Sequence, residues 1–109
     1  MSIEEILREL REDRVHGASW YFLRSIDVIK LAIESNFNTN SIKALLNELR
    51  NIRPGMASII NLTNIIEDAI NMGLNLNDVI NRLKSWYEDA TKRLIAQLDR
   101  YQLGVGQGR

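Results

Sequence analysis

Hydrophobic residues recur at three- and four-residue intervals along most of the chain, and this spacing predicts α-helices. The first such run covers residues 2–14, with one apolar face made of Ile3, Ile6, Leu7 and Leu10. Ser2 is followed three residues later by Glu5, the pattern of a capping box. We therefore expect the first helix to begin after Ser2 and to end near Asp13.

Three further runs, at 18–35, 41–52 and 54–72, repeat the helical spacing with short polar connections. Pro54 is expected at the first position of the fourth helix, with Arg53 before it displaced from the helical conformation. The fourth run has the broadest apolar face, so we expect it to be central and packed on two sides.

The last run is expected to start at Asn77 as a cap and to continue to about Tyr101. Its inner face is expected to comprise Val79, Ile80, Leu83, Tyr87, Ala90, Leu94, Leu98 and Tyr101. The final LGVGQGR is expected to leave the helix, with a flexible tail at 104–109. No segment alternates as a β-strand would. The sequence thus predicts an all-α fold of about five helices, in a compact bundle or orthogonal array, forming one domain over 1–103.

Composition excludes several classes of function. The 109 residues include 14 basic and 14 acidic residues, so no positive field favours direct binding of nucleic acid. With no cysteine and one histidine, neither a thiolate nucleophile nor a Cys-rich or His-rich metal site is expected, and no cofactor. We see no signal peptide and no apolar run near the ~20 residues of a membrane span, so no membrane partner and a cytoplasmic location are expected.

Two helix starts combine basic residues with glycine. In RVHGAS, residues 14–19, His16 and Gly17 precede a helix whose free N–H groups could bind an anion. In RPGMAS, residues 53–58, Arg53 precedes another helix start. Each motif also has a simpler interpretation, as a joint between two helices with an exposed basic side chain. The spacing alone leaves both interpretations open.

Aromatic residues cluster at two places, 20–22 and 86–87. Because successive helical residues turn by about 100°, Trp20, Tyr21 and Phe22 cannot all face one core. We therefore expect Trp20 or Tyr21, and Trp86, to contribute to an interface. No nucleophile, base and orienting group come together in the sequence, so this chain by itself is not expected to be an enzyme.

The two motifs together resemble a known superfamily. DRVHGASWYFLRSIDVIKLAIES, followed about twenty residues later by LLNELRNIRPGMASIINLTNIIEDAI, is similar to the N-terminal helical domain of a group of proteins. This group joins the alpha, beta and delta subunits of translation initiation factor 2B with methylthioribose-1-phosphate isomerase and ribose-1,5-bisphosphate isomerase. The similarity is strongest to the archaeal initiation factor 2B-related members and covers about residues 10–95.

The resemblance implies a phosphate site made by His16, Gly17, Ala18 and Arg53. Gly17 and Ala18 match a Gly-Ala that approaches a sugar phosphate, and Arg53 matches the arginine of an Arg-Pro pair. His16 stands where the isomerases carry arginine. Their catalytic Cys and Asp belong to a following α/β domain that this sequence does not include.

Two functional hypotheses follow from the sequence and rank ahead of a third, a fragment of an isomerase that needs its α/β half and for which the sequence offers no catalytic residue. The first is a non-catalytic binding module that associates with itself, as a homo-oligomer, or with a larger relative containing the α/β domain. The near-zero net charge, which does little to oppose self-association, favours this hypothesis. The alternative is a domain that binds a sugar phosphate or nucleotide phosphate without its catalytic half.

Overall fold

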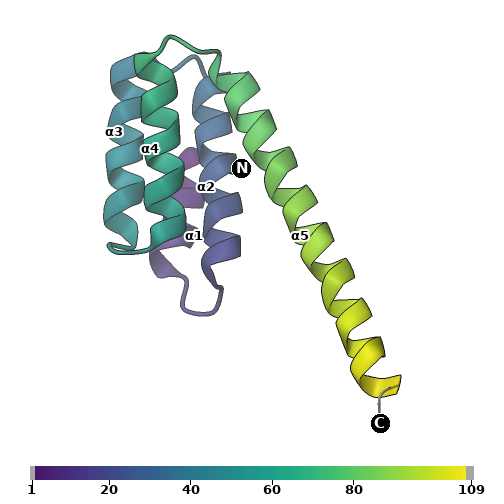
Figure 1. The fold of residues 1–109 in the computed structure, drawn as a ribbon. Coiled ribbons are helices and arrows are strands. Elements are labelled where there is room, and N and C mark those ends of the chain that lie inside the picture. The colour runs from purple at the N-terminus through teal and green to yellow at the C-terminus, as the bar shows by residue number, and fades with distance from the viewer. Residues whose placement is uncertain (1, 108–109) are drawn as a thin grey trace.

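A computed structural model describes the backbone of residues 2–107, and the side chains of 2–90, 92 and 93. The described chain forms five helices and contains no strand, which confirms the all-α prediction (Figure 1). The helices are α1 (Ile3–Glu12), α2 (Ala18–Glu34), α3 (Thr39–Ile52), α4 (Ala57–Asn71) and α5 (Leu76–Gln107).

The first four helices run alternately up and down in a bundle, and α2 lies on the side of the bundle that faces α5 (Figure 1). α2 packs against each of the other four helices, whereas α4 packs against α2, α3 and α5. The prediction that the fourth helix is packed on two sides is confirmed, but α2 rather than α4 contacts every other helix. α2 buries Ser25, Ile26, Val28 and Ile29, which point in several directions around its axis, while α4 leaves Ile65 at 44% exposure.

The joint before α4 also differs from the sequence prediction. Arg53, Pro54, Gly55 and Met56 form a turn in which the Met56 N–H donates to the Arg53 carbonyl at 3.1 Å. Gly55 has φ of 87°, the conformation required at the third residue of a type II turn and incompatible with a helix. Pro54 is the second residue of this turn rather than the first of α4, which begins at Ala57.

Side-chain caps set several helix starts. The Ser2 hydroxyl accepts from the Glu5 N–H at 3.2 Å, as the capping pattern predicts. Asn38 accepts from the Ser41 N–H at 2.8 Å, so α3 begins two residues earlier than expected. The cap of α5 is Asn75, which accepts from Asp78, and not Asn77.

α5 is longer than predicted. Its backbone remains helical through Gln107, past the expected end near Tyr101. Glycine disfavours a helix by only about 1 kcal/mol and leaves its backbone N–H free to bond, so the helix can continue through Gly104 and Gly106. The flexibility expected of 104–109 stays a prediction, and residues 108 and 109 lie outside the described residues.

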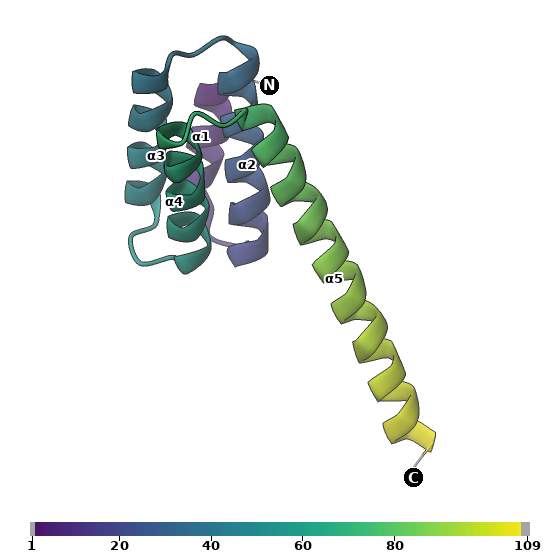
Figure 2. The same ribbon diagram turned by 45° about the horizontal axis from the view of Figure 1, so that its top comes forward.

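The core joins all five helices, but α5 contributes little to it. Among the described side chains of α5, Ile80 is fully buried and Leu83 and Tyr87 are partly buried against the bundle. Beyond this point α5 leaves the bundle and gives the molecule its extents of 58 × 31 × 26 Å (Figure 2). No described helix combines the length and apolarity that crossing a membrane requires.

Candidate functional site

The loop between α1 and α2 is organised by the carboxylate of Asp13. This carboxylate accepts from the backbone N–H groups of Val15 and His16 at 3.3 and 2.9 Å. The His16 Nδ1 atom lies 2.6 Å from the other carboxylate oxygen. This local ring of hydrogen bonds is an Asx-type turn, which holds the chain as it enters α2.

A buried tyrosine connects this loop to the turn before α4. Tyr21 is only 2% exposed, and its hydroxyl donates to the Asp13 carboxylate at 3.0 Å. The Nε and Nη2 atoms of Arg53 donate to the same hydroxyl oxygen at 3.0 and 2.8 Å. Arg53 also donates to the backbone carbonyl of Asp13. The Arg53 guanidinium thus links the α1–α2 loop to the turn before α4 through hydrogen bonds.

The hydrogen bonds around Asp13 change its acidity. Desolvation acts to raise its pKa, but hydrogen bonds from the side chain and backbone of His16, and from Tyr21, act more strongly in the other direction. With a smaller contribution from the His16 charge, they lower the pKa of Asp13 from 3.8 to about 2. The carboxylate therefore remains ionised throughout the physiological pH range.

The structure brings the four residues of the suggested phosphate site to one end of the bundle. Gly17 has φ of −96° and is extended, so it does not use the left-handed conformation open to glycine. The His16 ring stacks on Trp20 with centroids 4.3 Å apart. Arg53 already binds Asp13 and Tyr21. The carboxylate of Asp13 already accepts hydrogen bonds from His16 and Tyr21, so these donors are not available to a bound anion.

The first turns of α2 and α4 nevertheless meet at this end. Neither Gly17 nor Met56, the residues preceding the two helices, makes a side-chain cap. The Ser58 hydroxyl lies 3.5 Å from the carbonyl oxygen of Ala18. The two helix starts therefore border the same surface.

That surface continues into an apolar groove between α2, α4 and α5. The groove has a volume of about 740 Å³ and lies between the diverging α5 and the bundle. Phe22 and Tyr87 stack at its base with centroids 4.8 Å apart. Trp86 is 65% exposed at its edge, and Ile65 borders it from α4. Two large apolar side chains thus face solvent beside an open groove, an arrangement typical of a protein-binding surface.

The three aromatic residues expected at an interface have different environments. Trp86 lies exposed beside the groove, and Trp20 is half-buried between His16 and Tyr21. Tyr21 instead lies in the core, where its ring packs and its hydroxyl joins the two loops, so it presents no surface to a partner. Sequence reasoning did not single out Asp13 or Ile65. An Asx turn at Asp13 could have been predicted from its position at the end of a helix, three residues before His16.

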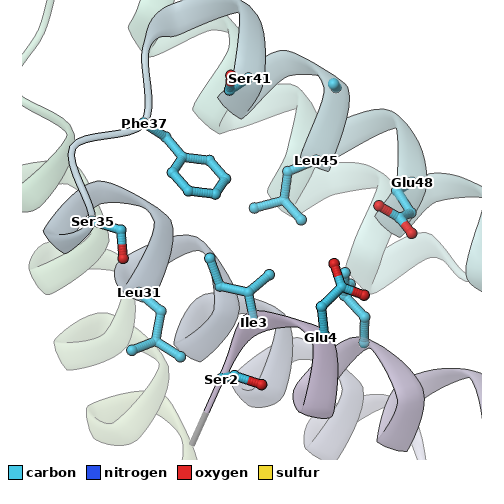
Figure 3. Close-up of a pocket in the computed structure, with 11 residues that line it drawn as sticks. Ser2, Ile3, Glu4, Leu31, Ser35, Phe37, Ser41, Leu45 and Glu48 are labelled. Carbon is cyan, nitrogen blue, oxygen red and sulfur yellow. The ribbon is translucent and has the colours of Figure 1, made fainter.

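A second, smaller pocket of about 550 Å³ lies at the opposite end of the bundle, between α1, α2 and α3. Ile3, Leu31 and Leu45 converge on its interior, and the Phe37 ring covers one side (Figure 3). Ser2, Ser35, Ser41, Glu4 and Glu48 are at its margin. The described residues that line this pocket include no basic side chain and none of the residues predicted as functional.

Within the part of the chain whose side chains are described, no three His, Asp or Glu residues gather as metal ligands. Comparison of the chain with protein-family models, with curated proteins and with solved structures finds no match.

Proposed function

We propose that the chain is a non-catalytic helical interaction module that acts in the cytoplasm. It associates with itself or with a larger, α/β-containing relative of the initiation factor 2B group that its two motifs resemble. The observation that carries this proposal is the groove between α2, α4 and α5, with Trp86 and Ile65 exposed beside it.

Two physical arguments support an association role. Tryptophan is among the residues that contribute most to binding energy in protein interfaces, and Trp86 lies exposed beside an apolar groove. The chain also has zero net charge, so long-range repulsion does not keep copies apart.

Light scattering over a range of concentrations, on the chain alone and mixed with an α/β-containing relative, tests the proposal. We expect Trp86→Ala to weaken the association. The matched control is Leu74→Ala, which also removes a half-exposed apolar side chain but lies outside the groove. A chain that stays monomeric at high micromolar concentration and binds no such relative would contradict the proposal.

One observation favours a second candidate, the binding of a sugar phosphate. Arg53 and the uncapped start of α2 lie at the same end of the bundle, joined through Tyr21 and Asp13. For Arg53 to bind phosphate, its guanidinium has to exchange the Asp13 carbonyl for a phosphate oxygen. Helix starts with free N–H groups would then complete the anion site.

Calorimetry with ribose 5-phosphate and with inorganic phosphate tests this candidate. Gly17→Ala is the useful variant, because a Cβ at position 17 meets no atom within 4 Å. The substitution therefore retains the fold but obstructs a close approach of ligand to the backbone. Equal, negligible heats for the wild type and Gly17→Ala would eliminate the candidate.

A further inference from the structure

α5 extends well beyond the helices that support it. It has 32 residues and α2 has 17, which correspond to lengths of about 48 and 26 Å. Among the described residues, the helices that contact α5 are α2 and α4. The described α5 residues that pack on the bundle are Leu76, Val79, Ile80, Leu83 and Tyr87, all in its first half. The outer half continues away from the bundle (Figure 2).

The apolar spacing of α5 is symmetric about its middle. On the predicted inner face, the residues at positions 80, 83, 87, 94, 98 and 101 are separated by intervals of 3, 4, 7, 4 and 3, and Val79 and Ala90 add to this face without an apolar counterpart. The order of these intervals is the same in both chain directions. An antiparallel second copy with residue 90 opposite residue 91 therefore matches apolar positions with apolar positions. Two matched pairs, Leu83 with Leu98 and Tyr87 with Leu94, start from residues that line the groove, whereas Ile80, which matches Tyr101, is buried in its own bundle and takes no part in the pairing.

We propose that two copies of the chain pair through α5 in this antiparallel register, so that the outer half of each α5 fills the groove of the other copy. Leu83, Tyr87 and Ala90 of α5 line that groove. The register brings the partner's segment 91–98 alongside these residues. This inference rests on the proposed function and names its partner as a second copy.

The charges near the centre of α5 agree with the register. Glu88 and Asp89 are exposed, as are Lys92 and Arg93. In the antiparallel pair, the acidic residues of one copy lie at the level of the basic residues of the other. A parallel, in-register pair would place like charges at the same level.

The groove and the outer half of α5 also have complementary charge. Asp68 is the one charged residue among the described residues that line the groove. Segment 91–107 contains three basic residues and one acidic residue, for a net charge of +2. Each copy would contribute the paired residues of α5 and the residues that line its groove. Together these approach the roughly 20–30 residues that each partner contributes to a specific interface.

Disulfide trapping tests the register directly, because the chain contains no cysteine. In the proposed pair, the two copies of residue 90 are displaced by one residue, about 1.5 Å along the axis. Ala90→Cys is therefore expected to form a linked dimer under mild oxidation. The two copies of residue 83 are about 22 Å apart along the axis, so Leu83→Cys is expected to stay unlinked. Both positions are half-buried and lie on the same apolar face.

Linking of both variants would indicate a parallel pair, and linking of neither would exclude pairing in this register. Either result overturns the inference. If light scattering shows association while Ala90→Cys does not link, the inference fails and the proposed function stands. Charge reversal gives a second measurement that does not alter the apolar face. Asp89→Arg is expected to weaken association by about two- to fivefold, and Asp89→Arg with Arg93→Asp to restore most of it.

Discussion

Asp13 has several roles although its side chain is short. It closes the loop after α1, accepts from the buried hydroxyl of Tyr21, and through its backbone carbonyl accepts from Arg53. Because these hydrogen bonds favour the ionised carboxylate, the pKa of Asp13 falls from 3.8 to about 2 on folding. Folding and ionisation of this residue are therefore linked.

The lowered pKa of Asp13 makes stability depend on pH in the acid range. Between pH 4 and pH 2 the unfolded chain binds a proton at Asp13 that the folded chain does not. The contribution of Asp13 is complete above the unfolded pKa and is lost as the pH falls towards 2. Urea midpoints measured against pH are thus expected to fall over this range, and less steeply for Asp13→Asn. Glu12→Gln, at an exposed neighbouring position, is the control; an acid dependence unchanged in Asp13→Asn would contradict the prediction.

Ser25 carries a hydroxyl that makes no hydrogen bond in the interior. Its side chain on α2 is fully buried, and its Oγ atom has no partner. A buried polar group without a partner loses its hydration and gains nothing in return. Ser25→Ala is therefore expected to raise the free energy of unfolding by about 1 kcal/mol in urea denaturation. Ser19→Ala, at an exposed position of the same helix, controls for helix propensity, and a destabilised Ser25→Ala would show that the hydroxyl has a partner.

Sequence patterns predicted residues with local roles better than residues with distant partners. The Ser2 cap and the displacement of Arg53 by Pro54 follow from neighbouring residues, and both are seen. The partners of Arg53 were not predictable, because Tyr21 and Asp13 are 32 and 40 positions away in the chain. The aromatic cluster at 20–22 predicted that Trp20 or Tyr21 contributes to an interface, and it did not predict that Tyr21 is buried.

At the level of helices, polar contacts fix α3 against α4. Arg50 on α3 donates to Thr63 at 3.0 Å and to Asn64 at 3.1 Å, and it also pairs with Glu67. The hydroxyl of Thr63 is buried and itself donates to the Ile60 carbonyl. The pair with Glu67 is partly exposed and contributes little, so the contact with Thr63 is the more important one.

Loss of this contact is expected to destabilise the bundle. Arg50→Ala leaves the buried Thr63 oxygen without a donor and is expected to lower the free energy of unfolding by about 1 to 2 kcal/mol. Urea denaturation measures the difference. Arg8→Ala, at an exposed position of α1, is the matched control. Equal stabilities for the two variants would mean that apolar packing alone holds α3 on α4.

The helices also show which features of an element a sequence pattern determines. Each of the five expected helices is present, because apolar spacing over several turns is a strong signal. The observed helix boundaries differ from the predicted ones where the backbone conformation of a single residue determines them. The positive φ of Gly55, for example, makes α4 begin later in the chain than predicted. The packing partners of α2 and α4 depend on three-dimensional arrangement, and the width of the apolar face of α4 did not determine which helix contacts every other helix.

For the whole molecule, the shape determines how stability should respond to concentration. A compact four-helix bundle with a long, diverging α5 leaves the groove and the outer half of α5 uncovered in the single chain. If a second copy covers them, unfolding is coupled to dissociation, and mass action makes the melting temperature depend on protein concentration. A monomeric chain has no such dependence.

The melting temperature is consequently expected to rise by roughly 3 °C for each tenfold increase in concentration, given the unfolding entropy of two chains of this length. Calorimetry or circular dichroism over a hundredfold concentration range measures the slope. Asp89→Arg places like charges at the same level of the proposed pair, so the melting temperature of this variant is expected to depend less on concentration. The double reversal with Arg93→Asp is expected to restore the dependence. A wild-type melting temperature that does not change with concentration would mean that the chain unfolds as a monomer, with its groove open to a different partner.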